Sequence, residues 1–316
     1  MYEQPETFSP NSISASERYL TKWTKTFDFY FLVGWIIALI SLFVVTLKMQ
    51  PELFYAYNFF AFCGLKIFVM IVMSFIGGMI CRYYCKTDEN GYILANSHKW
   101  FKVNYTRKLQ HFAAYIIPLI GPAAAPYGII PHLWETLWVL LVFLLLIEPI
   151  RTRSTFFMLQ FNSMDRPEDR PYTLKWIIMG NILPGLLLSI VAQQVFEDLL
   201  HEHHLALIIV LIVGIGDGLA EPVGIHWGKK KYMVPSWNMK KRYIRSYVGS
   251  ACVYITSIIC VLVFYKDFNN VNEFVAALLL IPFVMTLAEA FAPHSMDTPV
   301  MMILGYGVLY GICYIL

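Results

Sequence analysis

Long apolar runs limit what this chain can fold into more than any other feature. Nine stretches are apolar over roughly the 20 residues that a helix needs to cross the hydrocarbon core of a bilayer. They cover 28–47, 54–80, 111–130, 133–150, 174–193, 205–226, 247–265, 274–291 and 299–316. Proline or charge interrupts the third and the sixth. The sequence therefore predicts an all-α, polytopic transmembrane helical bundle of about nine spans.

Composition agrees with a surface that faces lipid. Hydrophobic residues make up 58% of the 316 residues and charged residues 14%, whereas soluble domains carry about 25% charged residues. The net charge of +3 is too small to favour a nucleic-acid partner. We expect a lipid bilayer as the main partner and no nucleic acid, and the sequence leaves a homodimer open. The six cysteines form no C-x-x-C pair and are interpreted as packing residues.

Lysine and arginine predict how the chain is oriented in the membrane. Four segments, 1–27, 81–110, 151–175 and 227–246, hold 21 of the 24 Lys and Arg residues. The loops that alternate with them hold only Lys48 and Lys266. Because cytoplasmic loops are enriched in Lys and Arg, we expect a multi-pass protein with a cytoplasmic N-terminus. The segments 107–111, 165–173, 217–249 and 289–299 would then meet at the cytoplasmic face.

The segment after Gly216 combines small residues with charge. Asp217, Ala220, Gly224 and Gly228 are spaced by three, four and four, which places them on one face of a helix. Glu221 follows Asp217 by one turn. Small residues at this spacing are typical of closely packed membrane helices. Carboxylates within a membrane are costly and are usually functional, so the alternative is a site that binds phosphate and a metal ion.

This segment resembles the pattern D-x-x-A-x-x-x-G-x-x-x-G of the CTP-dependent polyprenol, dolichol and phytol kinases, membrane lipid kinases related to phosphatidate cytidylyltransferases. In that family a K-S/T-x-E-G element follows. Its counterpart here is Arg245–Gly249, in which Arg245 replaces the lysine and Val248 replaces the glutamate. The gap between Gly228 and this element is also longer than the family's usual gap.

Three other segments resemble the family in the same order. They are RKLQH at 107–111, RPEDRPYT at 166–173 and EAFAPHSMDTP at 289–299, where Thr298 stands in place of the usual asparagine. The resemblance implies a lipid kinase-like transmembrane catalytic domain over 106–316. Residues 1–27 would be a polar cytoplasmic segment, and 28–105 would add two transmembrane helices and a basic cytoplasmic loop.

The resemblance implies transfer of a phosphoryl group from CTP to the hydroxyl of a membrane lipid alcohol, with Mg²⁺. Its implied catalytic residues are Asp217, His111, Asp297 and Glu289. Its implied metal ligands are Asp217 and Glu221. The implied nucleotide-binding residues are Arg107, Lys108, Ala220, Gly224, Gly228, Lys229, Arg245, Ser246 and Gly249.

Two other functions remain open at this stage. A cytidylyltransferase that makes a CDP-lipid from a lipid phosphate would use the same residues but attack the α-phosphate of CTP. A membrane transporter or scaffold would have no chemistry at this face, and a transporter would carry polar residues near the middle of several spans. One such residue is Lys66, which we expect either to reach the interface or to pair with an acid such as Glu148.

Overall fold

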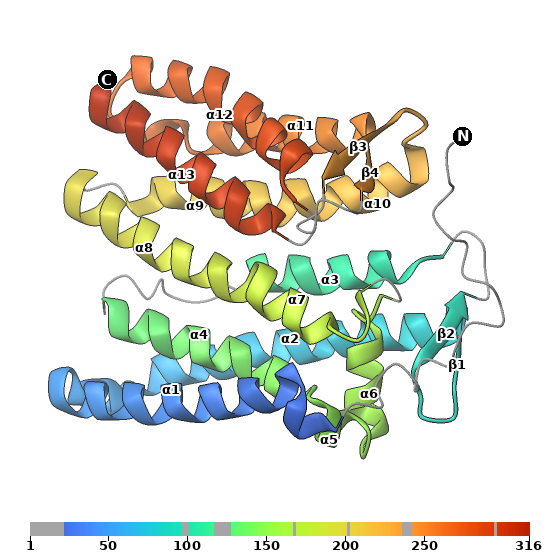
Figure 1. Ribbon diagram of the computed structural model, residues 1–316. Coiled ribbons are helices and arrows are strands. Elements are labelled where there is room, and N and C mark those ends of the chain that lie inside the picture. The colour runs from blue at the N-terminus through green and yellow to red at the C-terminus, as the bar shows by residue number, and fades with distance from the viewer. Residues whose placement is uncertain are drawn as a thin grey trace.

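Helices of the computed structural model run side by side along one direction (Figure 1). The structure describes residues 22–96, 101–116, 128–166, 169–200, 203–235, 242–293 and 296–316. Most of the predicted polar segment 1–27 lies outside these ranges. Of the residues in these ranges, 81% are helical, which agrees with the all-α prediction.

The first half of the bundle contains four helices along the bundle axis. They are α1 (Phe27–Met49), α2 (Tyr57–Tyr84), α3 (Val103–Ile116) and α4 (Ile129–Leu144). The predicted span 133–150 is shorter in the structure, because Glu148 and Pro149 begin the separate short helix α5 (Glu148–Arg151), which α6 (Thr155–Asn162) follows. The predicted span 111–130 falls partly on 117–127, outside the described residues.

The second half contains two composite rods and three regular helices. The first rod joins α7 (Thr173–Ile177), the π-helical η7 (Ile178–Ile182) and α8 (Leu183–Leu200). The second joins α9 (Ala206–Leu211), the π-helical η9 (Ile212–Asp217) and α10 (Gly218–Trp227). The regular helices are α11 (Tyr247–Val263), α12 (Val271–Phe291) and α13 (Asp297–Ile315). Short 3₁₀ turns are η2 (Trp23–Lys25), η3 (Pro51–Tyr55), η8 (His203–Leu205) and η10 (Tyr265–Asp267).

Six of these helical segments are long and apolar enough to cross a membrane. They are Phe27–Met49, Tyr57–Tyr84, Thr173–Glu197, Ala206–Trp227, Val271–Phe291 and Asp297–Ile315. Only 11% of the apolar window of α1 is buried inside the protein, so lipid is needed to cover the rest. The protein is thus an integral membrane protein of apolar helices. α4 and α11 are apolar but shorter, and the count of nine spans stays a prediction.

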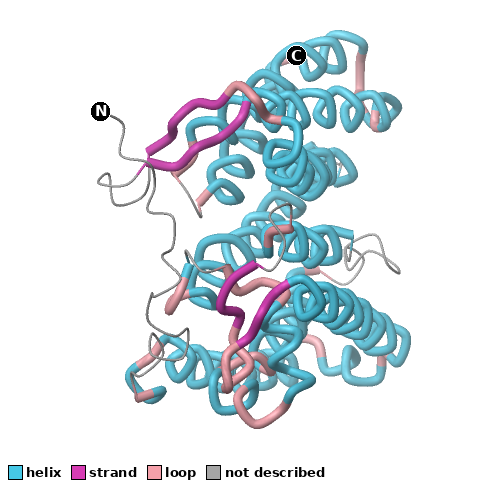
Figure 2. Tube along the Cα trace, turned by 90° about the vertical axis from the view of Figure 1, so that its right-hand side faces the viewer, coloured by secondary structure: helices cyan, strands magenta, loops and turns pink. Residues whose placement is uncertain are grey.

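Two small antiparallel hairpins, which the sequence analysis did not predict, lie at one end of the bundle (Figures 1 and 2). One pairs β1 (Cys85–Thr87) with β2 (Ile93–Asn96), and the other pairs β3 (Lys231–Pro235) with β4 (Arg242–Ser246). α5 and α6 lie at the same end (Figure 1). Parts of three predicted basic segments are therefore gathered at one end of the helices, as the charge alternation required.

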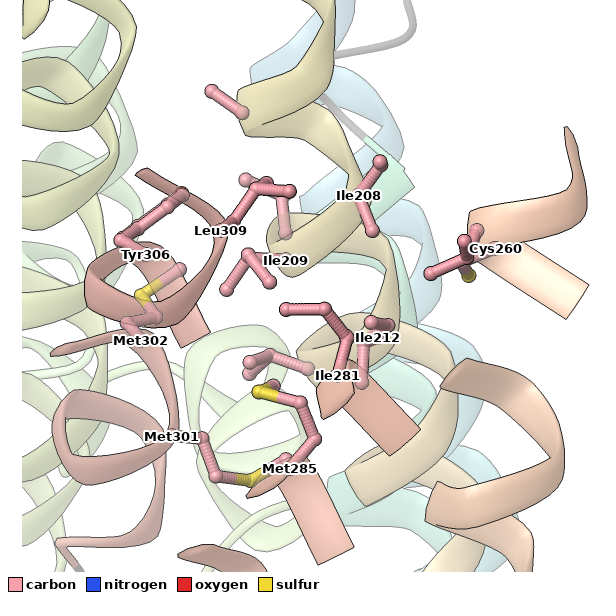
Figure 3. Close-up of a cluster of buried hydrophobic side chains, with 14 of the residues drawn as sticks. Ile208, Ile209, Ile212, Cys260, Ile281, Met285, Met301, Met302, Tyr306 and Leu309 are labelled. Carbon is pink, nitrogen blue, oxygen red and sulfur yellow. The ribbon is translucent and has the colours of Figure 1, made fainter. Parts of the chain in front are cut away.

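A tightly packed apolar core holds the second half together (Figure 3). Ile209 and Ile212 from the second rod meet Ile281 and Met285 of α12 and Met301 of α13, and all five are fully buried. Because lipid is as apolar as these side chains, their contacts stabilise the bundle through close van der Waals packing rather than by removal from water. This core fixes α12 and α13 beside the rod that carries Asp217.

Helices from both sides of residue 105 pack against one another. Trp134 and Leu137 of α4 share one apolar cluster with Leu42 of α1 and with Phe59 and Cys63 of α2. Helices from both predicted segments therefore form the first half of the bundle. The polar side chains of the candidate site lie between this half of the bundle and the second half.

Candidate functional site

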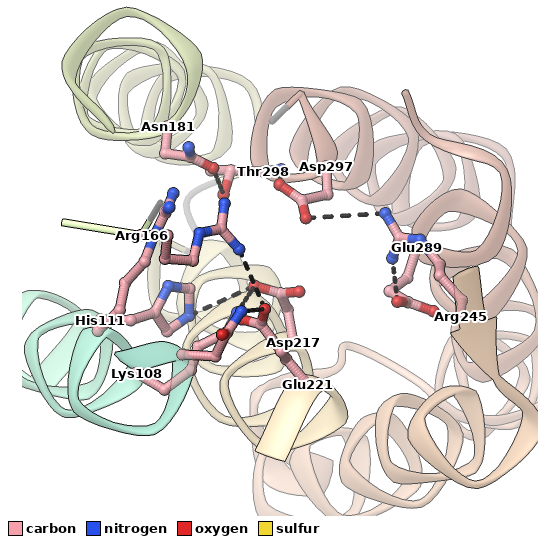
Figure 4. Close-up of polar contacts among 12 residues, drawn as sticks. Lys108, His111, Arg166, Asn181, Asp217, Glu221, Arg245, Glu289, Asp297 and Thr298 are labelled. Atoms are coloured by element: carbon pink, nitrogen blue, oxygen red, sulfur yellow. Dashed lines mark hydrogen bonds and ion pairs between the residues drawn. The ribbon is translucent and has the colours of Figure 1, made fainter. Parts of the chain in front are cut away.

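Charged and polar side chains from six separate segments of the chain converge between α3, α10, α12 and α13 (Figure 4). We call this group the polar cluster. Its members are Lys108, His111, Arg166, Asn181, Asp217, Glu221, Arg245, Glu289, Asp297 and Thr298. Seven of them are among the site residues predicted from the sequence, so the structure brings together most of the predicted charges.

Asp217 lies at the centre of one side of the polar cluster. Its side chain is 7% exposed, and its Oδ2 accepts a hydrogen bond of 2.9 Å from Nζ of Lys108 on α3. Nε2 of His111, one turn further along α3, lies 3.7 Å from the same oxygen. An amphipathic α3 therefore places two nitrogen-bearing side chains against one buried carboxylate.

Both composite rods change to π-helix where they contribute to the polar cluster. η7 carries Asn181, whose Oδ1 accepts a hydrogen bond of 3.0 Å from Thr298. η9 carries Asp217 and also Val213, whose carbonyl oxygen lies 3.1 Å from Nε2 of His111. Single π-helical turns inside α-helices occur frequently at functional sites.

The contact with Val213 fixes how the His111 imidazole is protonated. A carbonyl oxygen only accepts hydrogen bonds, so Nε2 of His111 must carry the hydrogen in this contact. Nδ1 is then the nitrogen with a free lone pair when the ring is neutral. If His111 acts as a base, it does so through Nδ1.

Glu221 lies one helical turn after Asp217 and is surrounded by donors. Its Oε1 accepts from Asn104 at 2.6 Å and from Arg166 at 3.1 Å, and its Oε2 lies 3.8 Å from Nζ of Lys108. Arg166 also pairs with Asp169 at 2.8 Å. These contacts attach the loop before α7 to α3 and α10.

The other side of the polar cluster is built around Arg245, at the end of the β3–β4 hairpin. Its guanidinium forms an ion pair with Glu289 of α12 and lies 3.8 Å from Oδ2 of Asp297 on α13. Burial acts to lower the pKa of Arg245, but the carboxylates of Glu289, Asp297 and Asp217 outweigh it and raise the pKa above its ordinary value. Arg245 therefore stays charged. Oε2 of Glu289 also accepts from Ser250 at 3.1 Å.

The glycine stripe of α10 lies in a close helix contact. A Cβ at Gly224 would lie 2.5 Å from Oγ of Ser246, and one at Gly249 would lie 2.6 Å from the carbonyl oxygen of Ala220. A Cβ at Gly228 would also meet Ser246, at 2.5 Å. The stripe is thus closed by the start of α11, where Ser246 caps the helix by accepting from the Gly249 amide. These residues position Arg245 rather than expose backbone to a ligand.

Two predicted phosphate-binding residues have other surroundings. Lys229 is exposed and lies beyond the C-terminal end of α10, which ends at Trp227. Arg107 forms an ion pair with Asp169, beside the polar cluster rather than within it. The cations that face the carboxylates are instead Lys108, Arg166 and Arg245.

Within the described ranges, no group of three or more His, Cys, Asp or Glu side chains is arranged to hold a metal ion. Mg²⁺ is commonly held by one or two carboxylates together with substrate phosphates. Both predicted ligands already have donors, since Asp217 accepts from Lys108 and Glu221 accepts from Arg166 and Asn104.

Five residues of the site and its surroundings are not among the site residues predicted from the sequence: Asn104, Arg166, Asp169, Asn181 and Thr298. Arg166, Asp169 and Thr298 lie in segments that were singled out, so the signal was present at the level of the segment. Asn104 and Asn181 stand outside any motif. Only their contacts with Glu221 and Thr298 identify them.

Comparison with known proteins adds no relative. No family model, no curated protein and no solved structure matches this chain. The function must therefore be inferred from the sequence motifs and from the geometry of the polar cluster.

Proposed function

We propose that this protein transfers a phosphoryl group from CTP to the hydroxyl of a membrane lipid alcohol of the polyprenol, dolichol or phytol type, at the cytoplasmic face and with Mg²⁺. One observation carries the proposal. The segments around 107–111, 166–173, 217–221, 245–249 and 289–298 lie far apart in sequence, yet their charged side chains converge in one cluster (Figure 4). These are the same segments that resemble the lipid kinases.

Phosphoryl transfer requires little covalent chemistry from the protein. Catalysis depends instead on positioning the reactants and on neutralising phosphate charge. Lys108, Arg166 and Arg245 supply three cations at the polar cluster. Each is paired with a carboxylate in this structure. A triphosphate can exchange with those carboxylates without leaving a cation unpaired.

The remaining roles fall to residues beside these cations. When Mg²⁺ is bound, Asp217 would hold it, and the ion would neutralise charge on the phosphates. His111, through Nδ1, would accept the proton of the lipid hydroxyl. The lipid chain would lie between helices whose outer faces are apolar, with its hydroxyl at the depth of the polar cluster.

A kinase assay tests this proposal directly. Purified protein in detergent is incubated with γ-labelled CTP, Mg²⁺ and a panel of polyprenol, dolichol, phytol, farnesol and diacylglycerol. We expect labelled lipid phosphate and CDP from at least one alcohol, and loss of the product in Asp217→Asn. No labelled lipid from any alcohol would contradict the proposal.

Glu273→Gln is the matched control for Asp217→Asn. Glu273 is also a buried carboxylate, but it caps the start of α12 by accepting from Asn269 and Asn270. Its substitution changes a buried charge away from the polar cluster. We expect this variant to keep the kinase activity of the unchanged protein.

The product formed from CTP distinguishes a kinase from a cytidylyltransferase. A cytidylyltransferase given CTP and a lipid phosphate releases pyrophosphate, whereas a kinase releases CDP. Measuring both products in the same incubation therefore decides between the two functions.

Ion-coupled transport is a second candidate function, and the position of Asp217 favours it. Asp217 lies near the middle of the apolar segment Ala206–Trp227, where ionisable residues commonly mark transport pathways. Flux of an ion or solute through proteoliposomes that is lost in Asp217→Asn, without any CTP turnover, would support transport.

A further inference from the structure

The outer face of the β3–β4 hairpin carries an exposed apolar pair. The strand register places Met233 directly opposite Ile244, and the two side chains are 54% and 55% exposed. Successive side chains of a strand point to opposite faces. On the other face Val234 is buried, and the hydroxyl of Tyr232 lies 2.6 Å from Oγ of Ser250 on α11. One face of the hairpin thus packs on the helices, whereas Met233 and Ile244 point away from them.

The exposed apolar surface continues from the hairpin onto α11. Val248, Ile255 and Ile259 are spaced by seven and four residues, which places them on one face of that helix, and all three are exposed. α11 is an apolar helix of 17 residues, and an exposed apolar face of a membrane helix is covered by lipid. Ile244 lies only four residues before Val248. The outer pair of the hairpin therefore adjoins, along the chain, a face that lipid covers.

Aromatic residues flank the hairpin where it joins its two helices. Trp227 ends α10 and Tyr247 begins α11, and both side chains are exposed. Trp227 also ends the segment Ala206–Trp227, which is long and apolar enough to cross a membrane. Trp and Tyr are enriched at membrane–water interfaces, because each combines an apolar ring with one polar group. These two residues therefore favour a position of the hairpin base at the depth of the lipid headgroups.

The hairpin and its flanks are strongly basic. The segment 227–246 holds seven Lys or Arg residues and no Asp or Glu. Lys229, Lys230 and Lys231, directly before and at the start of β3, are exposed. Within the described ranges, none of their three ammonium groups pairs with a carboxylate. Their charge is complementary to a surface of anionic headgroups.

Lys66 on α2 shows the other use of a lysine in this bundle. Its Nζ donates to Oε1 of Glu135 on α4 at 2.6 Å. Lys66 therefore neither reaches the interface nor pairs with Glu148, which corrects both interpretations made from the sequence. Its charge is compensated inside the protein, whereas the charges of Lys229–Lys231 are available to a partner outside it.

We propose that the outer face of the β3–β4 hairpin docks on the headgroup layer of an anionic lipid leaflet. Met233 and Ile244 insert between the headgroups, and Lys229–Lys231 contact the lipid phosphates. Buried apolar area and attraction to anionic lipid are the two contributions that hold amphipathic elements at a membrane surface. Figure 2, which views the hairpin end of the bundle, shows this hairpin reaching out to one side of the helices. The inference does not depend on the proposed kinase activity.

Native mass spectrometry of the full-length protein in detergent tests the contribution of charge. Phosphatidylglycerol and phosphatidylcholine of equal chain length are titrated, and the Kd of each is obtained from the fraction of protein with bound lipid. We expect phosphatidylglycerol to bind more tightly. A lysine near an anionic lipid surface contributes about fivefold in affinity. The triple variant Lys229→Gln, Lys230→Gln, Lys231→Gln should therefore bind phosphatidylglycerol at least about fivefold more weakly.

The triple variant Lys25→Gln, Lys86→Gln, Lys102→Gln is the matched control. These three lysines are also exposed, and their removal changes the net charge by the same amount away from the β3–β4 hairpin. This variant should keep the lipid preference of the unchanged protein. Equal affinities of the unchanged protein for the two lipids, or equal losses in the two triple variants, would overturn the proposal.

The depth of the apolar pair is measured separately, in vesicles that contain phosphatidylglycerol. On a background without native cysteines, a fluorophore attached to Ile244→Cys should be quenched by brominated lipid more than by iodide in the water. Glu89→Cys is the matched position, because Glu89 is exposed in the turn between β1 and β2 at the same end of the bundle. There iodide should be the stronger quencher.

Two results of the quenching experiment would contradict docking on lipid. Equal quenching by iodide at positions 244 and 89 would place the outer face of the hairpin in water. Protection of position 244 from both quenchers would show that protein, such as a second copy of the chain, covers this face.

Discussion

The side chain of Lys108 carries a charge that only other side chains can stabilise. It is 10% exposed and lies between Asp217, at 2.9 Å, and Glu221, at 3.8 Å. Removing one partner of a buried ion pair leaves the other charge uncompensated, which costs about 3–5 kcal/mol. The pairing of Lys108 with Asp217 and Glu221 therefore stabilises the fold around the polar cluster.

Lys108→Met is accordingly expected to destabilise the protein by about 3–5 kcal/mol. Thermal unfolding in detergent measures the loss, and Lys108→Arg should recover part of it. Lys229→Met is the control, because Lys229 is exposed, and surface substitutions usually change stability by less than about 0.5 kcal/mol. Equal melting temperatures for Lys108→Met and Lys229→Met would contradict this account of the site.

Cys85 illustrates how burial controls the reactivity of a single residue. It lies in β1, is 6% exposed, and burial raises the pKa of its thiol to about 11, although Arg170 acts to lower it. The thiolate is the nucleophile, and a raised pKa means that the thiol keeps its proton until the pH approaches that value.

A variant that retains only Cys85 should therefore react slowly with iodoacetamide in the folded protein near neutral pH. Mass spectrometry after timed labelling measures the rate, which should increase toward the raised pKa and increase strongly after denaturation in SDS. Rapid labelling of the folded protein near neutral pH would show that Cys85 is accessible and its pKa ordinary.

At the scale of elements, the contact between α10 and α11 sets the place of Arg245. Ala220 and Gly224 on α10 and Gly249 on α11 let the two helices approach without side chains between them. Ser246 caps α11 directly after Arg245 in β4. A change in this contact should move Arg245 relative to Glu289.

Gly249→Ala tests that contact. The added Cβ would lie 2.6 Å from the Ala220 carbonyl oxygen, a backbone atom that cannot move aside alone. We expect a loss of about 1–3 kcal/mol, as for other overpacked sites, measured by thermal unfolding. Gly307→Ala on α13 is the control, since nothing lies within 4 Å of its added Cβ. Alanine favours helix by up to about 1 kcal/mol, so this control should be neutral or stabilising.

At the scale of the whole molecule, the described parts of three basic segments lie at one end of the helices, as the charge pattern predicted. Lys230, just before β3, and Glu52, in the turn between α1 and α2, are both exposed. They belong to opposite ends of the bundle in Figure 1. The membrane should therefore separate them.

Cysteine labelling in intact cells tests this orientation. On a background without native cysteines, Glu52→Cys should react with a membrane-impermeant maleimide added outside. Lys230→Cys should react only after the membrane is opened, because Lys-rich and Arg-rich loops remain in the cytoplasm. Labelling of both positions from one side would contradict the topology, and the reverse pattern would place the polar cluster at the outer face.

The sequence alone determined the class of the protein and the grouping of its basic segments at one end of the helices. Both depend on local properties, because a run of apolar residues must be covered by lipid wherever it lies, and the charge of a loop does not depend on its neighbours. It also identified Asp217, Arg245, Glu289 and Asp297 before their contacts were visible.

Only the tertiary structure decided which charges meet and what the glycines do. The spacing of Gly224 and Gly228 fits both a bound ligand and a packed helix, and the position of Ser246 selects the second. The pairs Lys108–Asp217 and Lys66–Glu135 join residues 109 and 69 positions apart. Such pairs arise from the packing of distant helices, whose geometry no local pattern of residues encodes.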